Sequence, residues 1–138
     1  LDALHHPHPP VNFARDLARR RLATAAMDLS DGLAADLPRL CRASGVGAEI
    51  DPRALPSSPI LDAVASPLAA QVAFGDDYQL LFTAPAVHRA ALQTLADDHA
   101  VRVTRIGCTT QDPSIRLLEG AWPAPGFAHF STRSGTSP

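Results

Sequence analysis

The feature that most constrains this chain is an apolar run that ends in acidic and hydroxyl side chains and leads directly into a helix. Residues 23–29 have the apolar character of a short strand, and residues 28–32 read Asp-Leu-Ser-Asp-Gly. Over residues 31–44, apolar side chains recur with the spacing of a one-faced helix, at Leu33, Leu37, Leu40 and Cys41. Three oxygen-bearing side chains, Asp28, Ser30 and Asp31, therefore meet where a strand ends and a helix begins.

Two interpretations of these three side chains stay open from the residues alone. Ser30 is a good N-cap and Asp31 suits the first turn of a helix, so the group could serve only to cap the helix. Alternatively, if Asp28 and Ser30 lie in extended backbone, their spacing places them on one face. Two carboxylates and a hydroxyl at a helix N-terminus could then hold Mg²⁺ beside a phosphate.

The other patterns alternate between helix and strand without an internal repeat, which predicts a mixed α/β domain. Helices are expected at 12–22, 31–44, 60–73 and 85–98, and strands at 23–29, 48–51, 78–83, 101–106 and 115–118, with Gly107 ending the fourth strand. The side chains expected to face the core are Ala14, Leu17, Ala18 and Leu22 in the first helix and Val87, Ala91 and Leu95 in the last. Pro38 should kink its helix or limit its first turns, and Gly45 should help to end it.

Composition excludes several classes of protein. The 138 residues carry a formal net charge of −2 and are 19% charged, so neither nucleic acid nor a membrane surface is an expected partner. No apolar run approaches the roughly 20 residues of a membrane span. Cys41 and Cys108 are too few for a disulfide framework or a zinc site, and a cytoplasmic protein is expected. The prolines among His5, His6 and His8 predict a loop rather than a metal site.

A second informative stretch, residues 74–83, reads Phe-Gly-Asp-Asp-Tyr-Gln-Leu-Leu-Phe-Thr and predicts a turn that enters a strand. Adjacent residues of a strand point to opposite faces, so at most one of Asp76 and Asp77 can easily face a given pocket. That carboxylate either caps a turn or contacts a cationic ligand. The aromatic residues of the tail, Phe127 among them, either cover a sheet edge or stack on a planar ring.

These residues together resemble the thiamine-monophosphate kinase family. The resemblance rests on residues 28–37, 43–48 and 75–83, and on weaker elements at 6–9 and 126–130, all in the family's order. It covers residues 5–131 and implies a C-terminal domain. On this interpretation residues 1–10 are a linker from a missing N-terminal domain, 11–131 form the kinase domain, and 132–138 are a frayed tail.

The resemblance implies a fold, a reaction and a set of site residues. The superfamily of aminoimidazole ribonucleotide synthetase has C-terminal domains of the α/β (α+β) class, layered α/β/α with partial ferredoxin-like topology. The family uses Mg²⁺ and ATP to phosphorylate thiamine monophosphate to thiamine pyrophosphate, and the intact enzyme is expected to be a homodimer. By position, Asp28 would ligate Mg²⁺, Ser30 would contact ATP and Asp31 would ligate another Mg²⁺. Asp76 and Phe127 would contact the substrate, and no side chain is expected to act as a catalytic nucleophile or base.

This chain departs from the family pattern at several positions. Phe74, Asp76 and Gln79 stand where Gly, Glu and Glu are usual, and Arg39 stands where His is common. Two alternatives follow from the same stretches. One is another ATP-dependent synthetase of the superfamily, of the selenophosphate or aminoimidazole ribonucleotide type, and the other is a non-catalytic module that binds thiamine phosphate. On its own, a fragment that lacks the N-terminal domain is expected to be inactive.

Overall fold

The computed structural model describes residues 10–56 and 79–122. Their elements follow in the order α2 (Val11–Arg19), β1 (Ala25–Asp28), α3 (Leu33–Ser44), β2 (Gly47–Ile50), β3 (Leu80–Thr83), α5 (Arg89–Asp98), β4 (Gly107–Thr110) and β5 (Ile115–Leu117). Two short 3-10 helices, η1 (Pro52–Ala54) and η3 (Ala86–His88), lie between them. The described residues form both helices and strands, with parallel and antiparallel pairing, so the predicted mixed α+β class is confirmed.

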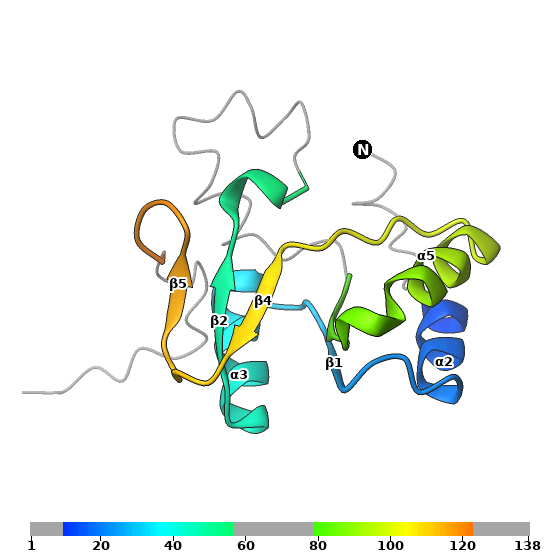
Figure 1. The fold of residues 1–138 in the computed structure, drawn as a ribbon, viewed down its shortest axis with the longest axis horizontal. Coiled ribbons are helices and arrows are strands. Elements are labelled where there is room, and N and C mark those ends of the chain that lie inside the picture. The colour runs from blue at the N-terminus through cyan, green and yellow to red at the C-terminus, as the bar shows by residue number, and fades with distance from the viewer. Residues whose placement is uncertain (1–9, 57–78, 123–138) are drawn as a thin grey trace, which may run out of the picture.

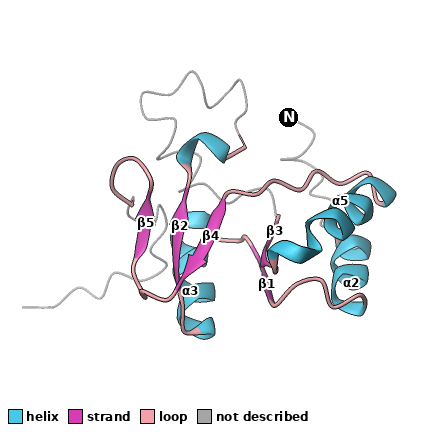
Figure 2. Cartoon of the chain, viewed as in Figure 1, coloured by secondary structure: helices cyan, strands magenta, loops and turns pink. Residues whose placement is uncertain are grey.

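The strands form two sheets. β1 pairs antiparallel with β3, so that Asp28 lies opposite Leu80. β2 is the central strand of the other sheet, antiparallel to β4 and parallel to β5. The β5–β2–β4 sheet lies toward one end of the molecule and the α2–α5 pair toward the other, with β1 between them (Figure 1). Figure 2, in the same view, shows the helices α2 and α5 side by side at one end of the molecule.

Helix α3 packs against both β1 and β2 and forms the first of two hydrophobic clusters. The four side chains that the helical spacing placed on one face are all buried there: Leu33, Leu37, Leu40 and Cys41. Gly45 ends the helix with φ 66°, a left-handed conformation that suits glycine, as predicted. The helix runs through Pro38, so this proline does not end it.

Helices α2 and α5 pack against each other around a second cluster, formed by Phe13, Leu17, Leu22, Leu95 and Ala96. The prediction is wrong for three core positions, because Ala18 and Ala91 are exposed and Val87 is 82% exposed. The chain after Pro85 first makes the 3-10 turn η3, with about three residues per turn. The helix α5 begins only at Arg89, so counting 3.6 residues per turn from Pro85 does not predict which side chains of η3 and α5 face the core.

Residues 101–106 form no strand, contrary to the prediction, and β4 begins at Gly107, which was expected to end a strand. The alternating apolar side chains of this segment have a different role. Val101 and Val103 pack against the second cluster, whereas Ile106 packs against the first. The segment therefore spans the two clusters, and its apolar side chains are explained by these contacts rather than by pairing in a sheet.

A short connection from β4 to β5 crosses the start of β2 at Gly47. A Cβ atom on Gly47 would lie 1.9 Å from the backbone oxygen of Asp112 and 2.3 Å from that of Ser114. The backbone N–H of Ala48 donates to the same Ser114 oxygen at 3.1 Å. Glycine is therefore required at this position because only its hydrogen leaves room for the crossing chain.

Several predictions concern residues outside those that the structure describes. They include the linker and tail boundaries, the helix at 60–73, and the site residues Asp76 and Phe127. Among the helices within residues 10–56 and 79–122, none has the length and apolar character needed to span a membrane.

Candidate functional site

The loop between β1 and α3 carries the oxygen-rich side chains, and its helix is capped differently from the prediction. The N-cap of α3 is Gly32, with φ 89° and ψ 158°, so Ser30 is not the N-cap and Asp31 precedes the helix. The carbonyl oxygen of Gly32 accepts hydrogen bonds from the backbone N–H groups of Ala35 and Asp36, at 3.1 and 2.9 Å. The glycine allows a sharp turn with positive φ, which begins the helix two residues later than a Ser30 cap would.

The carboxylate of Asp36 fixes this loop from within the protein. Asp36 is completely buried, and its Oδ2 accepts hydrogen bonds from the backbone N–H groups of Ser30 and Asp31, both at 2.9 Å. Its Oδ1 accepts a hydrogen bond from Arg39 Nη1 at 2.6 Å. A buried carboxylate is tolerated when its oxygens are satisfied in this way. Asp36 thus determines where the backbone of Ser30 and Asp31 lies.

Arg39 joins Asp36 to Asp31. Its Nη1 lies 2.5 Å from Asp31 Oδ2 and 2.6 Å from Asp36 Oδ1, so one guanidinium nitrogen bridges two carboxylates. The hydrogen bond to Asp31 is the main cause that raises the pKa of Arg39, and the bond to Asp36 adds to it. The Arg39 side chain is 52% exposed, whereas those of Asp31 and Asp36 are 18% and 0% exposed.

Asp28 stands at the exposed end of β1, beside the start of β3. The pairing continues for one residue beyond the strand, because the N–H of Leu29 donates to the carbonyl oxygen of Gln79 at 2.7 Å. Ser30, also exposed, lies in the bend that follows. The structure therefore brings the described end of the second informative stretch, residues 79–83, alongside the strand that ends in Asp28.

The chemistry of these donors fits Mg²⁺ as part of a larger ligand set. Asp28 and Asp31 supply carboxylate oxygens at one strand end, and Mg²⁺ is commonly bound by one or two carboxylates together with substrate phosphates. Within the described ranges, no three His, Cys, Asp or Glu side chains come together as a metal-binding group. The two carboxylates would therefore need phosphate oxygens or residues elsewhere to complete the coordination.

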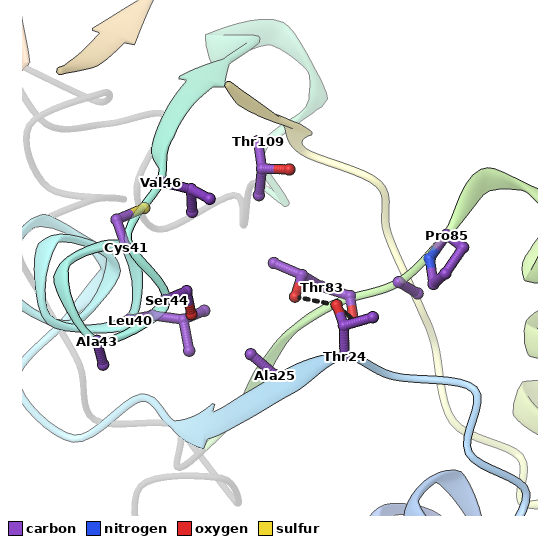
Figure 3. A pocket seen from close by; sticks show the side chains of 11 residues that line it. Thr24, Ala25, Leu40, Cys41, Ala43, Ser44, Val46, Thr83, Pro85 and Thr109 are labelled. Carbon is purple, nitrogen blue, oxygen red and sulfur yellow. Dashed lines mark hydrogen bonds between the residues drawn. The ribbon is translucent and has the colours of Figure 1, made fainter. Parts of the chain in front are cut away.

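A hollow lies near the start of β1 and the end of α3, whereas the carboxylates lie near the end of β1 and the start of α3. Its volume is about 590 Å³, and it is lined by small neutral side chains from both sheets and from the end of α3 (Figure 3). The hydroxyl groups of Thr24 and Thr83, which lie together on one side of it, are hydrogen-bonded at 2.8 Å. Its described lining has neither a cation nor a carboxylate, so it offers no group that would neutralise a phosphate or hold a metal.

Comparison with known families decides the class of the domain. The sequence profile described as AIR synthase related protein, C-terminal domain, matches residues 4–119. The chain belongs to this family. Curated relatives of this AIR synthase-related domain include the thiamine-monophosphate kinase of Salmonella typhimurium, 35% identical over a span that covers 92% of this chain and 42% of that protein. The thiamine-monophosphate kinase of Haemophilus influenzae is 37% identical, with 90% and 40% covered.

Solved structures agree with this assignment. The thiamine-monophosphate kinase from Stenotrophomonas maltophilia K279a is 36% identical with a TM-score of 0.75, and the match covers 83% of this chain and 37% of that one. AaThiL complexed with AMPPCP and TMP is 29% identical with a TM-score of 0.70, covering 87% and 37%. The AIR synthase-related domain therefore spans about two fifths of the length of the relatives it matches.

Sequence reasoning singled out Asp28, Ser30 and Asp31 but assigned no role to Asp36 or Arg39, which hold the loop that carries them. A signal was present, since Asp36 and Arg39 have the three-residue spacing of an ion pair on one helix face. Asp36 also interrupts an otherwise apolar buried stripe. An acidic residue on the core side of a helix requires partners, and the nearby loop is where they lie.

Replacing Asp36 by Ala should destabilise the chain by about 3 kcal/mol, because two backbone N–H groups and one guanidinium would lose their acceptor. Urea denaturation followed by circular dichroism measures the loss. Asp36→Asn is the matched control, since its amide oxygen still accepts hydrogen bonds and it should cost less than the alanine variant. Equal stability of wild type and Asp36→Ala would contradict the role assigned to this carboxylate.

Proposed function

We propose that this domain is the C-terminal part of an ATP-dependent kinase that phosphorylates thiamine monophosphate to thiamine pyrophosphate with Mg²⁺. The observation that carries the proposal is the placement of two carboxylates, Asp28 at the end of β1 and Asp31 on the loop that follows, whose backbone Asp36 holds. Relatives named thiamine-monophosphate kinase, and a relative in complex with AMPPCP and TMP, support the choice of ATP and thiamine monophosphate.

The proposed reaction needs the kind of groups that this site offers. The acceptor is a phosphate monoester whose second pKa is about 6, so its oxygen is largely anionic at neutral pH without a general base. The main barrier is repulsion between two polyanions, and bound Mg²⁺ supplies the neutralising charge. Asp28 and Asp31 would each ligate a Mg²⁺ ion, and Ser30 would contact ATP. Asp76 and Phe127, outside the described residues, would contact the thiamine substrate.

The complete activity requires more protein than this domain. Because the domain matches about two fifths of its relatives' length, we infer that an N-terminal domain supplies further metal ligands and much of the ATP site. We further propose that the complete enzyme is a homodimer and acts in the cytoplasm. These inferences rest on the resemblance to the kinase family and on the share of the relatives that the chain covers.

Formation of thiamine pyrophosphate from thiamine monophosphate, ATP and Mg²⁺ tests the proposal. Thiochrome fluorescence reports the product, with this chain alone and with the N-terminal domain of a related kinase added in trans. Product only in the second reaction is the expected result. Binding of thiamine monophosphate without product in either reaction, measured by calorimetry, would instead identify a non-catalytic binding module. Neither binding nor product would overturn the assignment to thiamine phosphate.

A further inference from the structure

Arg39 occupies the carboxylate that the proposed function assigns to a metal. Its Nη1 donates a hydrogen bond to Asp31 Oδ2 at 2.5 Å. A carboxylate oxygen that accepts a short charge-assisted hydrogen bond from a guanidinium is a weaker ligand for a second cation. Mg²⁺ and the guanidinium of Arg39 would therefore compete for the same group.

The two bonds of Arg39 differ in how easily they can be exchanged. The bond to Asp36 ends on a carboxylate that is completely buried and also holds two backbone N–H groups. The bond to Asp31 ends on a carboxylate that solvent reaches, and the Arg39 side chain itself is half-exposed. A cation arriving from solvent can reach Asp31 but not Asp36. Displacement of Arg39 from Asp31 would thus leave Asp36 paired.

We propose that Arg39 is a resident counter-cation of this site, and that a divalent cation that binds Asp31 Oδ2 displaces the Arg39 guanidinium from it. This inference rests on the proposed function, because it takes Asp31 as a metal ligand. Arg39 is a positioning residue: without bound metal, its guanidinium fixes the position of the Asp31 carboxylate relative to Asp36.

The competition has a consequence for the order in which ligands bind. A free divalent cation must replace an existing ion pair, which lowers its apparent affinity for the site. A cation that arrives with phosphate brings anionic oxygens, and these can pair with the guanidinium that leaves Asp31. Arg39 should therefore favour metal that is bound to phosphate over free metal.

Titration of the isotope-labelled chain with MgCl2 tests this displacement without any need for turnover. Amide chemical shifts of residues 28–32 report binding up to tens of millimolar, and KCl at matched ionic strength corrects for screening. Arg39→Gln should tighten the apparent Kd for Mg²⁺ by about tenfold, since it removes a charge-assisted bond to the ligand. Arg39→Lys keeps the positive charge and should restore an affinity close to that of wild type.

Arg42→Gln is the matched control, because Arg42 is an exposed arginine three residues further along the same helix. It removes the same charge, and its effect on the Kd should stay within about twofold. If the role of Arg39 were purely structural, Arg39→Gln would lower the thermal stability of the chain without tightening Mg²⁺ binding. Unchanged or weaker binding in Arg39→Gln would overturn the displacement, as would the absence of Mg²⁺-dependent shifts in both wild type and Arg39→Gln.

Asp31→Asn separates failure of this inference from failure of the proposed function. If Asp31→Asn binds Mg²⁺ as tightly as wild type, Asp31 is not a ligand and the metal assignment itself is wrong. If Asp31→Asn loses binding but Arg39→Gln leaves the Kd unchanged, only the role of Arg39 is wrong. Loss of binding in Asp31→Asn together with tighter binding in Arg39→Gln supports both.

Discussion

In the complete kinase proposed above, replacing Asp31 by Asn should lower kcat by about a hundredfold to a thousandfold, because a metal held by Asp31 would stabilise the charge that develops in phosphoryl transfer. The substitution removes a negative charge but keeps an oxygen that can accept the Arg39 hydrogen bond. The loop should therefore stay in place while the proposed metal ligand is lost. Steady-state kinetics at saturating ATP and thiamine monophosphate measure the effect.

Asp97→Asn is a suitable control for this experiment. Asp97 is exposed on α5 and accepts a hydrogen bond from Gln93, far along the chain from the site. It makes the same chemical change and should leave kcat nearly unaffected. Near-normal turnover of Asp31→Asn, with an unchanged dependence on Mg²⁺ concentration, would refute the assignment of Asp31 as a metal ligand.

Replacing Gly47 by Ala should destabilise the chain by about 4 kcal/mol or more, within the exceptional range for single substitutions. The new methyl group would overlap the backbone oxygens of Asp112 and Ser114, and backbone cannot move aside as a flexible side chain can. The connection from β4 to β5 would have to lift away from β2. Denaturant unfolding followed by far-ultraviolet circular dichroism measures this change.

Gly45→Ala gives the matched comparison, because it adds the same methyl group two residues earlier. Gly45 has φ 66°, but a Cβ atom placed there would meet nothing within 4 Å. The substitution should cost only about 1–2 kcal/mol, from left-handed backbone alone. Similar losses for the two variants would mean that the crossing chain is not what requires glycine at position 47.

The parts of the fold that could be predicted from sequence are those governed by a single strong periodicity. The buried face of α3 followed from the spacing of Leu33, Leu37 and Leu40, because a helix with one apolar stripe has only one way to bury it. The strands β1, β2, β3 and β5 also fell within or close to the ranges expected for them. In these segments the spacing of apolar residues along the sequence determines which side chains are buried, so the spacing alone predicts the element and its buried face.

The predictions failed where a local turn or a competing hydrogen-bond acceptor, rather than the apolar periodicity, decides the outcome. Val87 was placed inward by counting along one helix, but a 3-10 turn interrupts the count. Ser30 was a reasonable N-cap by composition, but Gly32 takes that position because Asp36 draws the N–H groups of Ser30 and Asp31 to itself. The position of Asp36 on the core side of α3 indicates that its carboxylate needs partners, but only the folded loop shows that these partners are the N–H groups of Ser30 and Asp31.

The β1–β3 ribbon has a further consequence, for the folding kinetics of the chain. Its two faces serve different clusters, since Leu81 belongs to the first cluster whereas Leu80 and Phe82 pack against the second. The ribbon also closes a long loop, because the paired residues Thr24 and Thr83 are 59 positions apart. Pairings of this sequence separation are slow to form, because the entropy of loop closure is lost before their contacts are gained. Both clusters should thus become stable together, in one slow cooperative step that waits for this ribbon.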